Sequence, residues 1–147
     1  MVGPIRFYSV GDEWGEFSNF APFPIVLAKK TWPTTEHYFQ AQKFKDPAAR
    51  ERVRKAKTPR LAARIGRDRK NKLRRDWESV KVQAMTDAVR AKFQQHEDLR
   101  ELLMSTGEAK LVEHTSNDAY WGDGGDGSGR NMLGLVLMRV RDELSSL

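Results

Sequence analysis

The chain has 147 residues, of which 39% are hydrophobic, with 26 Lys and Arg against 20 Asp and Glu and no cysteine. This length and composition suit one globular domain with one core. No stretch reaches the ~20 apolar residues needed to cross a bilayer, and the lack of cysteine excludes disulfides, thiolate metal sites and thiol redox chemistry. The net charge of +6 is compatible with a nucleic-acid partner or a phosphorylated small molecule.

The first part of the chain predicts two strands separated by an aromatic loop. Residues 5–10 read as a short strand, and residues 25–28 followed by Thr31 and Trp32 as a second strand compatible with a hairpin. In the loop, Phe17 and Phe20 could pin the chain to the core. Trp14, Ser18 and Asn19 could equally offer a stacking face and hydrogen-bonding groups to a ring-shaped ligand. The first residues show no charged segment before a long apolar run, so we expect no signal peptide and a cytoplasmic location.

A helix is predicted from Thr34, because Pro33 ends the preceding segment and threonine hydroxyls cap free helix N–H groups. At 3.6 residues per turn, Glu36, Gln40 and Lys43 lie along one face of this helix. Glu36 and Lys43 are too far apart for a simple surface ion pair. A solvated polar stripe and a site that places a ligand between the two charges both fit this pattern.

The middle and the end of the chain predict further helices. Asp46-Pro47 starts one helix that runs to about Lys57, and Thr58-Pro59 starts a short one that we expect Gly66 to end. Asp76 is predicted to cap a long amphipathic helix, and a shorter helix carries Leu99, Leu102 and Leu103. Residues 110–114 favour an extended segment, and a last helix begins at about Asn131. The predicted fold is α+β and mostly α: a single domain over residues 1–147 with a small β-sheet packed by several helices.

The glycine-rich loop at residues 122–129 contains the pattern GxGxxG. We do not expect a dinucleotide-binding fold, because no further strand with an acidic residue follows the pattern at the required distance. A P-loop lysine is missing, and Asp123 and Asp126 do not have the spacing of a calcium loop. Two interpretations remain: a backbone nest that receives an anion at a helix N-terminus, or a plain turn before the last helix.

The candidate chemical groups are carboxylates and one amine. The three histidines lack the spacing of a helical zinc site, so we expect no metal, and no motif indicates a nucleophilic serine. A buried lysine can become a nucleophile toward a sugar carbonyl, and a carboxylate can protonate a leaving nitrogen or activate water. The candidates for these roles are Glu36, Lys43, Glu113 and Asp118, with Trp14, Trp32, Trp77 and Trp121 as possible stacking platforms.

A basic block extends from Arg64 to Arg75. Such a block is compatible with a solvated surface, with phosphate capture by Arg64 and Arg67, or with nucleic-acid binding. The last of these is the least favoured, because no aromatic residues alternate with the charges.

Five motifs, taken in order, resemble the NADAR (YbiA-like) family. They are WGEFSNF at residues 14–20, WPTTEHYFQAQK at 32–43, ARIGR at 63–67, DAYWGDG at 118–124 and GRNMLGLVLM at 129–138. The resemblance covers nearly the whole chain and implies an N-glycosidase. Bacterial members cleave phosphoribosylamino-pyrimidine intermediates of riboflavin biosynthesis and release ribose 5-phosphate. Other members remove ADP-ribose from guanine in nucleic acid.

By this resemblance, Glu36 and Lys43 fall at the probable catalytic positions. Ser18, Asn19, Trp121 and Asn131 fall at substrate-binding positions. The resulting hypothesis is a cofactor-independent N-glycosidase in which Lys43 engages the ribose C1 and Glu36, with Asp118 as second candidate, moves protons. In this hypothesis Trp14 and Trp121 stack on the base, while Arg64, Arg67 and the glycine loop with Gly122 hold phosphate. The alternatives are an ADP-ribosyl-guanine hydrolase and a non-catalytic module that binds ADP-ribose or nucleic acid.

Overall fold

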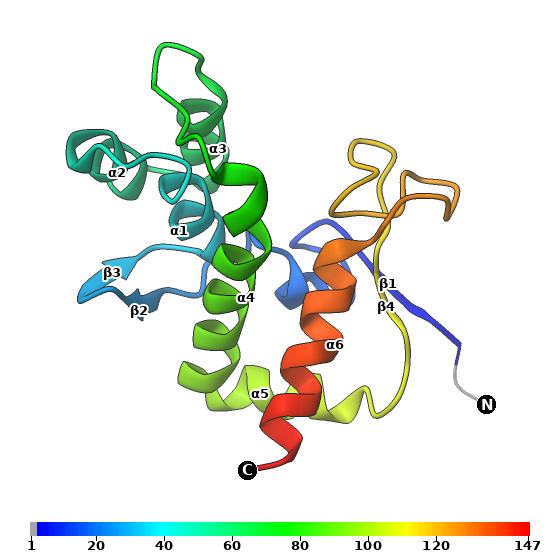
Figure 1. Ribbon diagram of the computed structural model, residues 1–147. Helices are drawn as coiled ribbons and strands as arrows, with labels where there is room; N and C mark the ends of the chain where they lie inside the picture. Colours follow the sequence, from blue (N-terminus) through cyan, green and yellow to red (C-terminus); the bar gives the residue numbers. More distant parts are fainter. Residues whose placement is uncertain (1–2) are drawn as a thin grey trace. The chain divides into compact units, whose positions relative to one another are not determined.

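The computed structural model describes residues 3–147 and contains mostly helices with a few short strands (Figure 1). The elements in chain order are β1 (Ile5–Phe7), a 3₁₀ turn (Gly15–Phe17), β2 (Ile25–Leu27), β3 (Lys30–Trp32), α1 (Thr35–Ala41), α2 (Pro47–Arg54), α3 (Pro59–Arg67), α4 (Trp77–Gln95), α5 (Glu97–Ser105), β4 (Leu111–Glu113) and α6 (Met132–Ser145). The predicted α+β class with mostly helix is confirmed. None of the described helices has the length and apolar content that crossing a membrane requires.

The described strands form two separate pairs, whereas the sequence suggested one small sheet. β1 and β4 pair in parallel with Ile5 opposite Leu111, and β2 and β3 form an antiparallel hairpin with Ile25 opposite Trp32. The predicted hairpin is therefore confirmed. β1 is shorter than predicted, since it ends at Phe7.

The chain divides into two compact units. The first unit comprises residues 1–21 and 93–147, and the second comprises residues 22–92. β1, β4, α5 and α6 belong to the first unit, while the hairpin and α1 to α3 belong to the second. Most of α4 also belongs to the second unit, which ends at Lys92.

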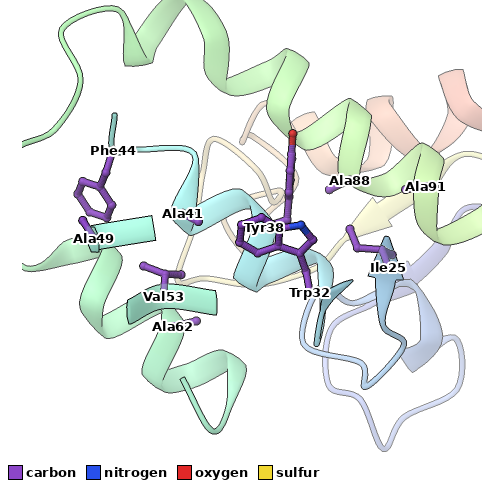
Figure 2. Close-up of a cluster of buried hydrophobic side chains, with 10 residues drawn as sticks. All are labelled: Ile25, Trp32, Tyr38, Ala41, Phe44, Ala49, Val53, Ala62, Ala88 and Ala91. Atoms are coloured by element: carbon purple, nitrogen blue, oxygen red, sulfur yellow. The ribbon is translucent and has the colours of Figure 1, made fainter. Parts of the chain in front are cut away.

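The second unit has a core around α1 (Figure 2). Trp32 and Tyr38 meet edge to face with ring centroids 5.2 Å apart. The cluster of buried side chains is completed from the hairpin, α1 and its following turn, α2, α3 and α4: Ile25, Ala41, Phe44, Ala49, Val53, Ala62, Ala88 and Ala91. Burial of each large apolar side chain contributes about 1.5–3 kcal/mol, so this cluster holds α1 firmly in place.

Three helices of the second unit begin as their sequences predict. The Thr34 side chain accepts a hydrogen bond from the His37 N–H, and Asp46 and Thr58 cap α2 and α3 in the same way, each followed by proline. α2 ends at Arg54, a few residues before the predicted Lys57. The expectation that Gly66 ends α3 is wrong, because the helix continues through Gly66 to Arg67.

The first unit is held together by aromatic contacts and by α6. Phe17 contacts Phe7 and Phe93 with ring centroids 5.8 and 5.9 Å apart, and its side chain is buried as predicted. Phe20, by contrast, is 38% exposed and does not pin the loop. The apolar face predicted for the last helix is confirmed by the burial of Leu133, Val136, Leu137, Val140 and Leu144.

Asp76 does not cap α4 as predicted. Its carboxylate accepts hydrogen bonds from the Arg74 guanidinium, and the Ser79 N–H bonds to the backbone oxygen of Asp76. The ion pair replaces the cap because arginine offers a planar pair of donors to a carboxylate.

Candidate active site

Glu36 lies on α1 with its side chain almost withdrawn from solvent. Its exposed fraction is 8%, which is unusual for a carboxylate on a short helix. The Gln40 side-chain amide, one turn later, donates a hydrogen bond to Glu36 Oε2 at 2.8 Å. The carboxylate is therefore held in a defined orientation in a partly desolvated place, as expected for a group that transfers protons.

Lys43 follows α1 in a turn and is not part of the helix itself. α1 ends at Ala41, which corrects the prediction of a single helical stripe. The Lys43 and Phe44 N–H groups bond to the carbonyls of Gln40 and Ala41, three residues earlier, so the chain tightens into a 3₁₀-type turn. In that geometry residues three apart are eclipsed, and Lys43 stays on the side of Gln40.

The environment of Lys43 shifts its protonation equilibrium toward the neutral amine. Burial lowers the pKa of Lys43, the Glu36 carboxylate raises it in part, and the Arg67 guanidinium lowers it further, so that the pKa lies below its ordinary value. This direction agrees with the desolvation inferred from the sequence. A lysine with a lowered pKa has a larger fraction of nucleophilic amine at neutral pH.

Arg64 and Arg67 lie on α3, which packs beside α1. Both side chains are exposed, and neither forms an ion pair with another residue of the described chain. The effect of Arg67 on the pKa of Lys43 places its charge near that amine. An unpaired guanidinium group near an amine is a group that can bind the phosphate of a substrate.

Trp14, Ser18 and Asn19 lie around the 3₁₀ turn of the first unit. Trp14 has a left-handed backbone with φ of 66°, and its ring stacks on Phe17 with centroids 5.7 Å apart. Ser18 is buried and its hydroxyl accepts a hydrogen bond from the Phe20 N–H, while Asn19 is half-buried. One face of the Trp14 ring is thus covered by Phe17.

Asp118 and Trp121 belong to a tight turn. Asp118 Oδ1 accepts hydrogen bonds from the N–H groups of Tyr120 and Trp121, each at 2.8 Å. The half-buried Trp121 ring meets the Tyr120 ring edge to face, with centroids 5.0 Å apart. Asp118 therefore sets the position of Trp121, and its second carboxylate oxygen has no hydrogen-bond partner in the described chain.

Asn131 and Gly122 have structural roles that sequence reasoning did not indicate. The Asn131 side chain accepts from the Glu113 N–H at 3.0 Å and donates to the Leu111 carbonyl at 2.9 Å, so it ties the start of α6 to β4. The Gly122 carbonyl accepts from the Asn131 N–H at 2.9 Å. A side chain at Gly122 would meet the backbone of Asp118, because an added Cβ would lie 2.8 Å from its oxygen.

The start of α6 does not form the anion nest considered from the sequence. The N–H groups of Met132 and Leu133 bond to the carbonyls of Tyr120 and Trp121. The turn that carries Trp121 thus uses the donors that an anion would need.

Asp123, absent from the predicted site, organises the glycine loop. Its buried carboxylate accepts from the N–H groups of Thr115 and Gly125 and lies 2.8 Å from His114 Nδ1. Asp123 stands in a run of glycines, a sequence that is typical of a flexible loop. Its partners Thr115 and His114 lie eight and nine residues away, and no sequence motif indicates these contacts.

A model of the NADAR domain matches residues 6–145. The chain belongs to the NADAR domain family. This match runs through both compact units of the NADAR chain, and it confirms the resemblance inferred from the five motifs.

Relatives of this NADAR chain include named enzymes. It is 60% identical to N-glycosidase YbiA of Escherichia coli over 96% of the chain and 88% of the relative, and 47% identical to N-glycosidase Npun_R5314 of Nostoc punctiforme over 97% and 94%. It is 44% identical to riboflavin biosynthesis protein VVA0006 of Vibrio vulnificus, over 98% of the chain but only 39% of that longer protein. The NMR structure of E. coli YbiA matches with a TM-score of 0.91 at 59% identity, covering 98% of this chain and 86% of the other.

The NADAR chain thus brings together some of the predicted site residues within each unit. In the second unit the Glu36 carboxylate is hydrogen-bonded by the Gln40 amide, and the charges of Glu36 and Arg67 both act on the Lys43 amine. In the first unit Asp118 and Trp121 share one turn. A single pocket shared by Glu36, Lys43, Asp118 and Trp121 would join residues of both units, and it stays a prediction.

The candidate site contains a carboxylate, Glu36, and an amine, Lys43, which are suited to acid–base and nucleophilic chemistry. Over residues 3–147, no group of three or more His, Asp and Glu side chains is arranged to hold a metal ion. His37 is buried with both ring nitrogens hydrogen-bonded, to Thr34 Oγ1 at 2.8 Å and the Ala56 carbonyl at 2.9 Å. Its role is to fix α1.

Proposed function

We propose that this protein hydrolyses the N-glycosidic bond of phosphoribosylamino-pyrimidine intermediates of riboflavin biosynthesis and releases ribose 5-phosphate. The observation that carries the proposal is a lysine with a lowered pKa beside a buried carboxylate, in a chain 60% identical to a named N-glycosidase. The name of the Vibrio relative, a riboflavin biosynthesis protein, supports this substrate class.

The proposed reaction uses Lys43 as nucleophile and Glu36 as proton carrier. The neutral Lys43 amine attacks the ribose C1, the bond from C1 to the pyrimidine-bearing nitrogen breaks, and Glu36 gives its proton to that nitrogen. The bond from C1 to the ring oxygen then breaks, a proton of the Lys43 nitrogen passes to that oxygen, and a Schiff base with the opened sugar results. Water then adds to C1, Glu36 takes a proton back, and ribose 5-phosphate leaves Lys43. The net reaction consumes one water molecule and needs no cofactor.

The other residues bind the two ends of the substrate. Arg67, whose charge lies near Lys43, and Arg64 on the same helix face hold the phosphate as charge-assisted hydrogen-bond donors. Trp121 and Trp14 stack on the base, and Ser18 and Asn19 offer polar contacts to its edge. Asp118 acts chiefly through Trp121, because its bonds hold the Trp121 backbone.

A second candidate function, the release of ADP-ribose from guanine in nucleic acid, is favoured by the distribution of charge. Residues 22–92, the unit that carries Glu36 and Lys43, contain twenty Lys and Arg against seven Asp and Glu. Such an excess attracts phosphate-rich partners over a longer range than one phosphoribosyl group needs. A non-catalytic module for the same ligands would show binding without turnover.

Direct competition between the two substrates tests the proposal. The purified protein receives equal concentrations of a phosphoribosylamino-pyrimidine and an oligonucleotide with ADP-ribosylated guanine, and the released sugars are separated by mass. We expect ribose 5-phosphate to form at the higher kcat/KM. Release of ADP-ribose alone would establish the second candidate, and binding of either ligand without any release would establish the binding module.

A further inference from the structure

Gln40 is clamped between Glu36 and helix α3. Its amide nitrogen donates to Glu36 Oε2 at 2.8 Å, while its amide oxygen is buried without a hydrogen-bond partner. The residue as a whole is 4% exposed. A buried carbonyl oxygen without a partner is unfavourable, and such groups concentrate where function requires them.

Gly66 makes the room for this amide. A Cβ added at Gly66 would lie 1.9 Å from Gln40 Oε1 and 2.8 Å from its Cδ, so any other residue would push the amide out of place. Gly66 lies within helix α3, where a glycine lowers the stability of the helix. The close approach of α3 to Gln40 explains why a residue without a side chain stands at this position, and it couples α3 to the orientation of Glu36.

We propose that Gln40 is a positioning residue that holds the Glu36 carboxylate for the reaction; this inference rests on the proposed function. An amide can serve both protonation states of a proton-transferring carboxylate. It donates through its nitrogen to the ionised form, and after a rotation it accepts through its oxygen from the protonated form. The Lys43 amine interacts with the Glu36 charge, and the Arg67 guanidinium acts on the same amine.

Replacement of Gln40 by methionine tests the role in turnover. Gln40→Met keeps the length of the side chain and removes both hydrogen-bonding groups. We expect kcat to fall about 10- to 100-fold, the worth of a hydrogen bond to a charged group, with a smaller change in KM. Gln83→Met is the matched control: Gln83 donates to Asp87 Oδ1 at 2.8 Å over the same four-residue spacing, on the exposed face of α4. Its turnover should be that of the wild type.

Titration of the Glu36 carboxyl group by carbon-detected NMR gives a readout that does not depend on activity. The Gln40 hydrogen bond favours the ionised carboxylate, so Gln40→Met should raise the pKa of Glu36, while Gln83→Met should leave it unchanged. The two claims can fail separately. If Gln40→Met raises the pKa of Glu36 but neither the wild type nor the variants have activity, Gln40 still positions Glu36 and the proposed function is wrong. If the pKa and kcat both stay at their wild-type values, the positioning role is overturned.

Gly66→Ala provides a second route that leaves both Glu36 and Gln40 in the chain. The added methyl group displaces the amide, so kcat should fall as in Gln40→Met. Gln40→Ala vacates that space, and adding Gly66→Ala to Gln40→Ala should then cause little further loss. Fully additive losses would contradict the inferred contact and overturn the proposal.

A different observation concerns a basic hollow of about 190 Å³ in the first unit. It is lined by β1, the segment before β4, the glycine loop and the start of α6, and three of its lining residues are Arg6, Lys110 and Arg130. The first unit has only six Lys and Arg against thirteen Asp and Glu. Half of its cations therefore surround one hollow.

These cations lack acidic partners. Arg6 and Lys110 form no ion pair within the described chain, and the Arg130 guanidinium lies over the Tyr120 ring at 5.2 Å. The carboxylate that lines the hollow, Asp123, already accepts two backbone hydrogen bonds and contacts His114. We infer that this hollow binds the phosphate group of a small phosphorylated molecule, because three converging cations suit a dianion.

Binding is measured by NMR chemical-shift titration with inorganic phosphate, ribose 5-phosphate and a short single-stranded oligonucleotide as separate probes. We expect both small phosphates to shift the N–H signals of Gly127 and Gly129, and Arg6→Gln with Lys110→Gln to weaken their binding at least 10-fold. Arg139→Gln, which removes an exposed partner of Glu143, is the control. Unchanged binding in the double variant, or a response to the oligonucleotide alone, would overturn the inference.

Discussion

Asp123 Oδ2 lies 2.8 Å from His114 Nδ1. This contact joins the glycine loop to the segment that follows β4. The same carboxylate accepts the N–H groups of Thr115 and Gly125. Burial alone would raise the pKa of Asp123, but the hydrogen bonds from His114, Gly125 and Thr115 outweigh this and hold the pKa at about 2. One buried side chain thus shapes a loop that contains four glycines between residues 122 and 127 and has little apolar content.

Removing this side chain should loosen the loop. We expect Asp123→Ala to lower the free energy of unfolding by about 2–3 kcal/mol, since buried N–H groups lose a charged acceptor. Asp126→Ala in the same loop is the control, because Asp126 is exposed and bonds only to Ser128, and its cost should be within about 0.5 kcal/mol. Urea denaturation measures both values, and equal costs for the two variants would contradict the role of Asp123.

The lowered pKa of Asp123 predicts that the free energy of unfolding depends on pH in the acid range. Its pKa in the folded protein, about 2, is below the ordinary value of 3.8, so the unfolded chain binds its proton first as the pH falls. The stabilisation is complete above about pH 4 and is lost as the pH falls toward 2. Unfolding free energies measured across this range should fall more steeply for the wild type than for Asp123→Ala. Parallel curves would be inconsistent with a lowered pKa.

Asn131 allows its structural and substrate-binding roles to be separated. Asn131→Gly keeps a residue suited to the left-handed backbone, with φ of 53°, but removes both hydrogen bonds to β4. We expect a loss of roughly 1–3 kcal/mol of unfolding free energy from the buried groups left without partners. Unchanged stability together with a raised KM would instead assign Asn131 to the substrate.

Three helix starts were predictable because capping is a local property, whereas the predicted cap at Asp76 was replaced by its ion pair with Arg74. Thr34, Asp46 and Thr58 lie next to the N–H groups that they cap, so the sequence alone indicates their role. The packing role of Gly66 was not predictable, because it depends on contact with the distant Gln40 side chain. Lys92 is similar: a lysine near a helix end suggests solvent exposure, but it is 2% exposed with its amine 5.6 Å from the Phe23 ring.

Within the candidate site, the chemical groups were chosen from their residue types and the positions of their neighbours, and their roles stay predictions. The supporting residues were not, because Gln40, Asp123 and the side-chain bonds of Asn131 act through contacts that neither periodicity nor motif spacing encodes. Asp118 illustrates the difference. Its carboxylate suggested proton transfer, while the structure shows it holding the backbone of Tyr120 and Trp121.

Salt dependence distinguishes the phosphorylated small molecule from nucleic acid. The binding constant for nucleic acid falls steeply with salt, because each neutralised phosphate releases counterions. A phosphoribosyl substrate makes only a few charge contacts, so log KM should change with log salt by a slope of about 1–2. Tight duplex binding with a slope of several units and no glycosidase turnover would favour the binding module.

Lys43→Arg separates chemical participation from attraction of charge. Arginine keeps the positive charge but has no usable nucleophile, so we expect a folded protein whose kcat is lower by at least about 1,000-fold. Circular dichroism and thermal unfolding check the fold. Near-normal turnover in this variant would leave Lys43 as an electrostatic contact.

Borohydride trapping locates the covalent step. If the opened ribose forms a Schiff base with Lys43, reduction during turnover should fix the sugar to the wild-type protein, and peptide mass should place it at Lys43. Lys43→Arg should show no adduct. If a sugar instead becomes attached to another lysine, at the same rate in the wild type and in Lys43→Arg, the adduct comes from a non-specific reaction.

The most direct test of the proposed activity is the stoichiometry of products from a phosphoribosylamino-pyrimidine, measured for the wild type and for Glu36→Gln. We predict that the wild type releases pyrimidine amine and ribose 5-phosphate in equal amounts. Glu36→Gln should fold and release both about 100- to 10,000-fold more slowly, since it lacks the proton-transferring carboxylate. A folded wild type that releases neither product, or a Glu36→Gln variant that works at the wild-type rate, would contradict the account.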